Sequence, residues 1–175
     1  MQGSGYLLKF IRDIPDFPKK GIVFKDITPL LQDAKAMRLG VDLMGAPFEG
    51  EGIDIVLGIE SRGYLFAAPL AYKLGAGLAL VRKPGKLPYK KMSADYELEY
   101  GSDTIEIHED AIQPGQRVLL ADDLVATGGT AAAALELVQR ARGSVVALTF
   151  LVELAFLSGV KKLEPHKVHA VLRFD

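Results

Sequence analysis

Short runs of apolar, largely β-branched residues alternate along this sequence with segments of helix length. This alternation is typical of a mainly parallel sheet, because each parallel strand must be followed by a long crossover, usually a helix. The pattern therefore predicts an α/β fold with a mainly parallel central sheet flanked by helices. The predicted strands are residues 54–58, 78–81, 118–121, 145–152 and 168–174, and the main predicted helices are residues 63–74 and 129–142.

The amino-terminal segment does not follow this alternation. Residues 1–30 contain Pro15, Pro18, Gly21 and Pro29, which interrupt regular helices and strands. We expect these residues to form a small hood appended to a core at about residues 31–175. With 175 residues in all, hood and core suit a single domain over residues 1–175.

A second irregular segment follows the strand at residues 78–81. Residues 82–93 are polar and too numerous for a simple connector, and loops of this length in compact domains are commonly functional lids. Residues 96–100 and 103–108 alternate in the manner of a hairpin. We therefore expect a flexible lid loop at about residues 82–101.

Composition excludes several classes of protein. The chain has no cysteine, which excludes disulfides and thiolate metal sites and fits a cytoplasmic location. Its 21 basic and 22 acidic residues give a net charge of −1, so nucleic acid is not an expected partner. The first residues lack the pattern of a signal peptide, and no apolar run reaches the roughly 18 residues that would span a membrane.

The turn at residues 122–130 carries the sharpest chemical signal. Asp122 and Asp123 follow an all-apolar strand, where the carboxyl edge of an α/β sheet places its ligands. Small residues then lead into a helix whose amino-terminal N–H groups suit a phosphate, while the two carboxylates suit ribose hydroxyls. The alternative is an ordinary strand-to-helix turn capped by Asp and Thr. Unpaired buried carboxylates are costly, which favours the ligand site.

This turn resembles the signature of the type I phosphoribosyltransferases, in which two acids precede Thr-Gly-Gly-Thr. Three further parts of the sequence narrow the resemblance to the adenine phosphoribosyltransferases: residues 17–29, residues 58–63, and residues 82–88 followed by 98–101. They occur in the family's order and cover almost the whole chain.

The resemblance implies the type I phosphoribosyltransferase fold and an activity. The reaction would join adenine to 5-phosphoribosyl 1-pyrophosphate (PRPP), giving AMP and pyrophosphate in purine salvage. It also implies Mg²⁺, held mainly by PRPP or pyrophosphate and water rather than directly by the protein, and a homodimer.

Residues 58–63 also have a physical logic of their own. They follow an apolar strand, so Arg62 and several backbone N–H groups are expected at the carboxyl edge of the sheet. An arginine fork binds phosphate oxygens in pairs, which suits pyrophosphate. The resemblance further implies a strained peptide bond between Glu60 and Ser61, with the cis form as one expectation.

The resemblance assigns the remaining roles residue by residue. The ribose and phosphate ligands are Asp122, Asp123, Ala126, Thr127, Gly128, Gly129 and Thr130. The pyrophosphate ligands are Glu60, Ser61, Arg62, Gly63, Arg82, Lys86 and Tyr100. The catalytic residues are Glu99, Arg62 and Lys86, and the adenine ligands are Val23, Phe24, Lys25 and Leu124. Many relatives have arginine at the position of Lys25, which matters only if that side chain contacts the base.

Three alternatives stay open. Without the resemblance, Glu99 would be an exposed strand residue and Phe24 a plain core residue. A related transferase would act on hypoxanthine, guanine, xanthine or orotate, although the tail 168–174 shows no evident lysine to contact a 6-oxo group. A ligand-sensing regulator would keep the site without turnover, but no basic DNA-binding segment is present.

The three histidines have no spacing that suggests a metal cluster.

Overall fold

Five parallel strands form the central sheet of the protein, seen in a computed structural model that describes residues 3–97 and 101–175. Their order across the sheet is β4, β3, β7, β8, β9, and every neighbouring pair is parallel. The predicted parallel α/β sheet is thus confirmed. The bounds are β3 (Ile55–Ile59), β4 (Gly77–Val81), β7 (Arg117–Val125), β8 (Ser144–Leu154) and β9 (Val168–Phe174).

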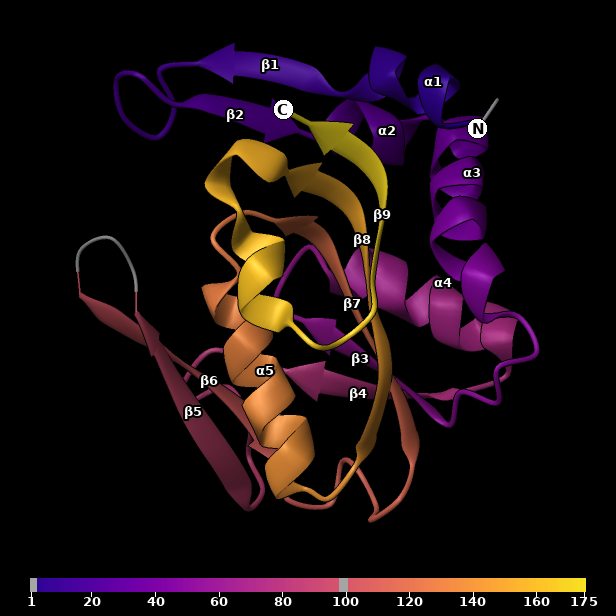
Figure 1. Cartoon of the computed structure of the whole chain (residues 1–175), viewed down its shortest axis with the longest axis vertical. Coiled ribbons are helices and arrows are strands. Elements are labelled where there is room, and N and C mark those ends of the chain that lie inside the picture. Colours follow the sequence, from indigo (N-terminus) through magenta and orange to yellow (C-terminus); the bar gives the residue numbers. More distant parts are fainter. Residues whose placement is uncertain (1–2, 98–100) are drawn as a thin grey trace. The chain divides into compact units, whose positions relative to one another are not determined.

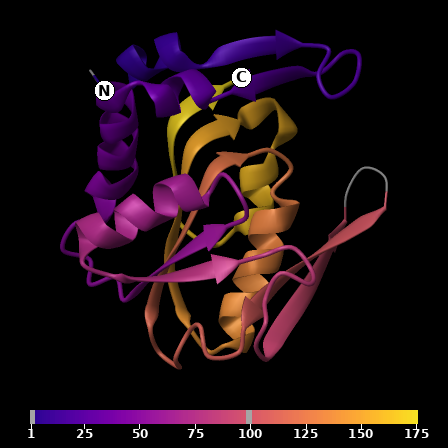
Figure 2. The ribbon, with the colours of Figure 1, turned by 180° about the vertical axis from the view of Figure 1, so that it is seen from behind.

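Helices cover both faces of this sheet. Helix α4 (Tyr64–Leu74) lies on one face and α5 (Gly129–Arg140) on the other, as Figures 1 and 2 show from opposite sides. Helix α4 ends at Gly75, whose φ of 66° is left-handed. It packs closely on β3, since a Cβ added to Gly58 would lie 2.7 Å from Ala67 Cβ.

Strand β7 is longer than the sequence pattern predicts. The apolar run ends at Ala121, but the strand continues through Asp122 and Asp123 to Val125. The reason is backbone pairing: β7 pairs with β3 only as far as Ala121, yet it pairs with β8 as far as Val125. The two aspartates therefore lie in a part of β7 that extends past its pairing with β3.

The predicted lid loop contains a strand. Strand β5 (Lys91–Glu97) pairs antiparallel with β6 (Ser102–His108), and together they run beside α5 (Figure 1). Residues 91–93 were expected in the loop as the end of a mainly polar segment, and this expectation is wrong. The less exposed Met92, Ala94 and Tyr96 alternate with exposed neighbours, which is the period of a half-buried strand.

Two 3₁₀ turns follow β8. They are η3 (Ala155–Leu157) and η4 (Gly159–Leu163), separated by Ser158 with a φ of 54°. Another 3₁₀ turn, η2 (Ala46–Phe48), precedes β3. None of the described helices combines the length and apolar character needed to cross a membrane.

The chain divides into two compact units, Met1–Leu43 and Met44–Asp175. The first unit contains a two-stranded antiparallel sheet in which an Arg12–Asp26 ion pair spans 3.4 Å. The predicted hood and core boundaries stay a prediction. The elements up to the division are α1 (Ser4–Leu7), η1 (Leu8–Phe10), β1 (Arg12–Pro15), β2 (Val23–Asp26), α2 (Thr28–Gln32) and α3 (Ala34–Gly45), the last of which crosses it.

Candidate active site

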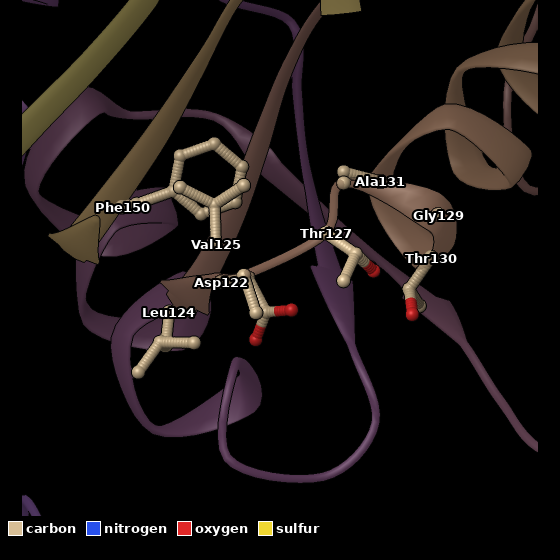
Figure 3. A pocket seen from close by; sticks show the side chains of 10 residues that line it. Asp122, Leu124, Val125, Thr127, Gly129, Thr130, Ala131 and Phe150 are labelled. Carbon is tan, nitrogen blue, oxygen red and sulfur yellow. The ribbon is translucent and has the colours of Figure 1, made fainter. Parts of the chain in front are cut away.

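The turn between β7 and α5 surrounds a small pocket of about 110 Å³. Gly128 precedes the first residue of α5 and has a φ of 78°, a conformation that glycine adopts without steric cost. Figure 3 shows the oxygens of Asp122, Thr127 and Thr130 on the same side of this turn. The lining residues are Asp122, Leu124, Val125, Ala126, Thr127, Gly128, Gly129, Thr130, Ala131 and Phe150. Six of the seven predicted ribose and phosphate ligands therefore line this pocket, and Asp123 does not.

A larger pocket of about 350 Å³ shares Asp122, Leu124 and Thr130 with the first. Its other walls come from the end of β3, from the β3–α4 turn, from Asp123, and from two residues within the predicted lid segment. The residues added by this pocket are Ile59, Glu60, Ser61, Arg62, Lys83, Tyr96 and Asp123. Because three residues line both pockets, the two pockets are neighbours at the carboxyl edge of the sheet.

Asp123 is a buried carboxylate, with only 4% of its surface exposed. Arg62 Nε lies 2.9 Å from Asp123 Oδ2, but this contact is an ion pair, and Oδ2 accepts no hydrogen bond from any residue in the described part of the chain. Burial raises the pKa of Asp123, while the charge of Arg62 opposes the rise. The ion pair with Arg62 therefore fixes the position of this carboxylate in the lining of the larger pocket.

The pKa of Asp122 is raised more than that of Asp123. Burial and then the charge of Asp123 raise the pKa of Asp122 well above its usual range. Its Oδ1 accepts a hydrogen bond of 2.8 Å from the Asp123 N–H. A Cβ on Gly63 would lie 2.6 Å from the same oxygen, so glycine at that position makes room for the carboxylate. Two adjacent acids beside a pocket, Asp123 buried and Asp122 partly buried, are typical of a functional site rather than of a stabilising one.

The β3–α4 turn contains the cis peptide bond between Glu60 and Ser61 that the resemblance implies. Glu60 Oε2 accepts hydrogen bonds from the Lys83 N–H at 2.8 Å and from Arg82 Nε at 3.3 Å. Burial alone would raise the pKa of Glu60, but these hydrogen bonds and the charges of Arg82 and Lys86 lower it. Glu60 thus holds the start of the lid loop against the pocket.

Lys83 and Tyr96 line the larger pocket, and neither is among the predicted site residues. Lys83 Nζ donates to Tyr96 Oη at 2.8 Å and to Asp103 Oδ2, and Tyr96 Oη donates to Asp103 Oδ2 at 3.0 Å. Burial would lower the pKa of Lys83, but these hydrogen bonds raise it. The signal that could have found this group is the register of the hairpin, in which Tyr96 and Asp103 face each other.

Other predicted site residues lie outside these two linings. Lys86 is exposed, and its carbonyl accepts a hydrogen bond of 3.2 Å from Arg82 Nη1. Glu99 and Tyr100 fall outside the described residues. Lys25 Nζ forms an ion pair of 2.7 Å with Asp13, within the amino-terminal unit.

Phe24 also belongs to the amino-terminal unit. Its ring meets the ring of Phe17 edge to face, with centroids 5.3 Å apart. Val23, the third adenine ligand predicted in this unit, has nearly half of its surface exposed. The three residues are consecutive in strand β2.

The acids of the site do not form a metal centre by themselves. Among residues 3–97 and 101–175, no three His, Cys, Asp or Glu side chains are grouped so as to hold a metal ion. Mg²⁺ binds through one or two carboxylates together with phosphate oxygens and water. The buried carboxylates beside a polar pocket fit such an ion, provided that a phosphorylated ligand supplies most of its oxygens.

Comparison with known proteins points to one family. The family model of the phosphoribosyl transferase domain matches residues 32–171. The adenine phosphoribosyltransferase of Trichlorobacter lovleyi is 57% identical over 164 residues, covering 94% of this chain and 96% of that protein.

Solved structures give the same result. The adenine phosphoribosyltransferase of Thermoanaerobacter pseudethanolicus has a TM-score of 0.95 and 51% identity, covering 98% of this chain and 99% of that one. The enzyme of Saccharomyces cerevisiae, complexed with an imino-altritol bisphosphate and adenine, has a TM-score of 0.93 and 39% identity, covering 98% and 99%.

Proposed function

Because this chain belongs to the phosphoribosyl transferase family, we propose that it transfers the phosphoribosyl group of PRPP to adenine, giving AMP and pyrophosphate. Purine salvage is the process that this reaction serves. The observation that carries the proposal is the pair of neighbouring pockets that share three lining residues, one beside the amino terminus of α5 and the other beside Arg62. Near-identical length and high identity to adenine phosphoribosyltransferases support adenine as the acceptor.

In the proposed complex the 5-phosphate occupies the smaller pocket. The N–H groups at the start of α5 and the hydroxyls of Thr127 and Thr130 surround this position, and the helix dipole favours an anion there. Asp122 and Asp123 accept hydrogen bonds from the 2- and 3-hydroxyls of the ribose. These hydroxyl donors would occupy acceptor positions that the described residues leave open on Asp123.

The pyrophosphate group of PRPP occupies the larger pocket. Ser61, Arg62 and Gly63 bring backbone N–H groups and a guanidinium to this side, and Arg82 and Lys86 lie at the start of the lid loop. The guanidinium of Arg62 is oriented by its ion pair with Asp123. The ion pair therefore links Asp123, the proposed ligand of the ribose, to Arg62, the proposed ligand of the leaving pyrophosphate.

The reaction replaces one bond at the ribose C1 with another. Adenine N9 forms a bond to C1 with its lone pair while the bond from C1 to the pyrophosphate oxygen breaks, and the electron pair leaves with that oxygen. Arg62 and Lys86 stabilise the negative charge that grows on pyrophosphate, and Glu99 is proposed to accept the proton from the purine. Bound Mg²⁺ would supply further stabilisation of the leaving group.

Val23, Phe24, Lys25 and Leu124 are the proposed adenine ligands. The support for the first three is the family resemblance and the exposed position of Val23 in strand β2. Leu124 lines both pockets of the core. An aromatic ring such as Phe24 can stack on any base, so the choice between adenine and 6-oxo bases must come from polar contacts.

A second copy of this chain is the proposed partner. Leu65 and Tyr72 are exposed by 44% and 92%, and their spacing of seven places them on one side of α4. Leu78 and Leu80 of β4 are exposed by 43% and 37%. Leu80 is paired with Gly58 of β3, where an added Cβ would point at α4, so Leu80 lies on the α4 side of the sheet. Exposed apolar side chains gathered in this way favour a protein interface. We further propose that this homodimer works in the cytoplasm.

The test is a product assay with purified protein. PRPP and Mg²⁺ are supplied with adenine, hypoxanthine, guanine, xanthine or orotate in turn, and the 5′-nucleotide of each base and pyrophosphate are measured by chromatography. Adenine is expected to give both products at the highest kcat/KM. A preference for a 6-oxo base would reject adenine as the substrate, and binding of PRPP without any product would favour a ligand-sensing regulator.

A further inference from the structure

The turn that forms the smaller pocket is backed by a glycine from a distant part of the sequence. A Cβ added to Gly159 would lie 2.7 Å from Gly128 N and 2.7 Å from Thr127 C, closer than the 3.0 Å that real Cβ atoms respect. A Cβ added to Gly128 would lie 3.0 Å from Gly159 C and 3.2 Å from its Cα. The backbones of the two glycines are thus in direct contact.

The two glycines are required for different reasons. Gly128 has a φ of 78°, so its conformation alone favours glycine. Gly159 is not among the glycines with positive φ, so alanine could adopt its backbone conformation. The missing side chain at residue 159 is therefore needed only for the space that the pocket turn occupies.

The segment that carries Gly159 is anchored in the core rather than in the pocket. Leu163, at the end of η4, is fully buried, and Val160 packs against the same hydrophobic cluster. Helix α5 contributes Ala131, Ala134 and other residues to this cluster, and η4 contacts α5 (Figure 1). The position of Gly159 is consequently set by packing that exists without any ligand.

We propose that Gly159 is a positioning residue for the phosphate-binding turn at residues 126–128. This inference rests on the proposed function, in which the N–H groups of this turn and of the first residues of α5 bind the 5-phosphate of the ribose. Hydrogen bonds to a charged group weaken steeply when donors move off their directions. A side chain at residue 159 pushes on Ala126, Thr127 and Gly128 and turns these donors away from the phosphate.

The test compares Gly159→Ala with the wild-type protein and with Gly143→Ala. A Cβ at residue 143 would lie 2.9 Å from Ile112 Cγ2 and 2.9 Å from Val138 Cγ1, so this control crowds the core without touching the turn. Isothermal titration calorimetry measures the Kd of ribose 5-phosphate, and of inorganic pyrophosphate with Mg²⁺, for each protein. Thermal denaturation measures the stability of each protein.

Gly159→Ala is expected to raise the Kd of ribose 5-phosphate by roughly 10- to 100-fold, the effect of losing one hydrogen bond to a charged group. The Kd of pyrophosphate should change by less than about threefold, which is within the scatter of context effects. Gly143→Ala should lose stability but keep both Kd values. An unchanged Kd for ribose 5-phosphate in Gly159→Ala, or an equal loss for both ligands or in both variants, would overturn the proposal.

A measurement on the wild-type protein covers the case in which Gly159→Ala does not fold. Ribose 5-phosphate should slow amide hydrogen exchange at residues 158–161 as well as at residues 127–130, since the two backbones are in contact. Protection confined to residues 127–130 would contradict a positioning role for Gly159. Failure of the wild-type protein to bind ribose 5-phosphate at all would instead count against the proposed function.

Discussion

Replacing Asp122 with asparagine is expected to stabilise the free protein and to weaken its binding of ribose phosphate. The two effects have one origin, the placement of a charged carboxylate where burial and the neighbouring Asp123 both raise its pKa. Asparagine has nearly the same shape and carries no charge. Its carbonyl oxygen can still accept the hydrogen bond of 2.8 Å that the Asp123 N–H donates.

The sign of the stability change follows from proton linkage. The folded protein holds the Asp122 proton to a higher pH than the unfolded chain, whose aspartate pKa is about 3.9. Wild-type stability therefore falls as the pH rises from that value through the raised folded pKa, and Asp122→Asn lacks this loss. At pH 7 to 8 the gain should be on the order of 1 kcal/mol, typical of single stabilising changes, or about 2–4 °C in Tm for a chain of this size.

The binding change has the opposite sign. A hydrogen bond from a ribose hydroxyl to a carboxylate contributes about 1.5–3 kcal/mol, whereas one to a neutral amide contributes about 0.5–1.5 kcal/mol. The difference of about 1–1.5 kcal/mol corresponds to a Kd for ribose 5-phosphate roughly tenfold higher. Calorimetric titration measures this Kd, and thermal denaturation without ligand between pH 5 and pH 8.5 measures stability.

Asp110→Asn serves as the matched control, because Asp110 is exposed and lies outside both pocket linings. This control should leave the Kd unchanged and show no gain in Tm that grows with pH. The reasoning is refuted if Asp122→Asn is less stable than the wild type at pH 8, or if it binds ribose 5-phosphate with wild-type affinity.

Three further substitutions test separate parts of the site. Asp103→Asn should lower the free energy of unfolding at pH 7 by at most about 1 kcal/mol, as for a partly exposed ion pair. Hydrogen bonding from Lys83 lowers the pKa of Asp103, so this loss of stability should shrink as the pH falls through that pKa. Denaturant titrations at pH 7 and pH 3 measure the loss, and an equal loss at both pH values would contradict the proposed ion pair. Glu99→Gln should reduce kcat with little effect on the Kd of PRPP, and wild-type steady-state kinetics would remove Glu99 from the mechanism. Phe24→Ala should raise the KM of adenine by about 5- to 100-fold, the value of one base stack, and leave the KM of PRPP nearly constant.

Much of the core could be predicted from local patterns. Apolar runs marked all five strands of the parallel sheet, and the last strand was predicted at its observed bounds of Val168–Phe174. The end of β7 could not be predicted, because Asp122 and Asp123 interrupt the apolar pattern while the backbone goes on pairing with β8. A hydropathy pattern predicts which side chains are buried, but it does not predict backbone pairing between strands.

Contacts between segments far apart in the sequence could not be predicted either. The ion pair between Arg62 and Asp123 depends on β3 and β7 being neighbours, and strand order has no local signal. The contact of Gly159 with Gly128 joins two turns that lie about 30 residues apart in the sequence, and no local pattern indicates it. The resemblance predicts ligand residues, but it does not predict the neighbours that pack against them.

The close packing of α4 on β3 limits how this protein can be engineered for heat resistance. Exchanging glycine for alanine commonly stabilises a protein by about 0.4–1 kcal/mol where the conformation allows it. At Gly58 the added methyl group would collide with Ala67 and lie 3.1 Å from Tyr64 Cδ1, so helix and strand would have to separate. Gly5 has no atom within 4 Å of an added Cβ and no positive φ, which makes it a suitable position for this exchange. A thermostabilisation library should therefore include Gly5 and exclude Gly58.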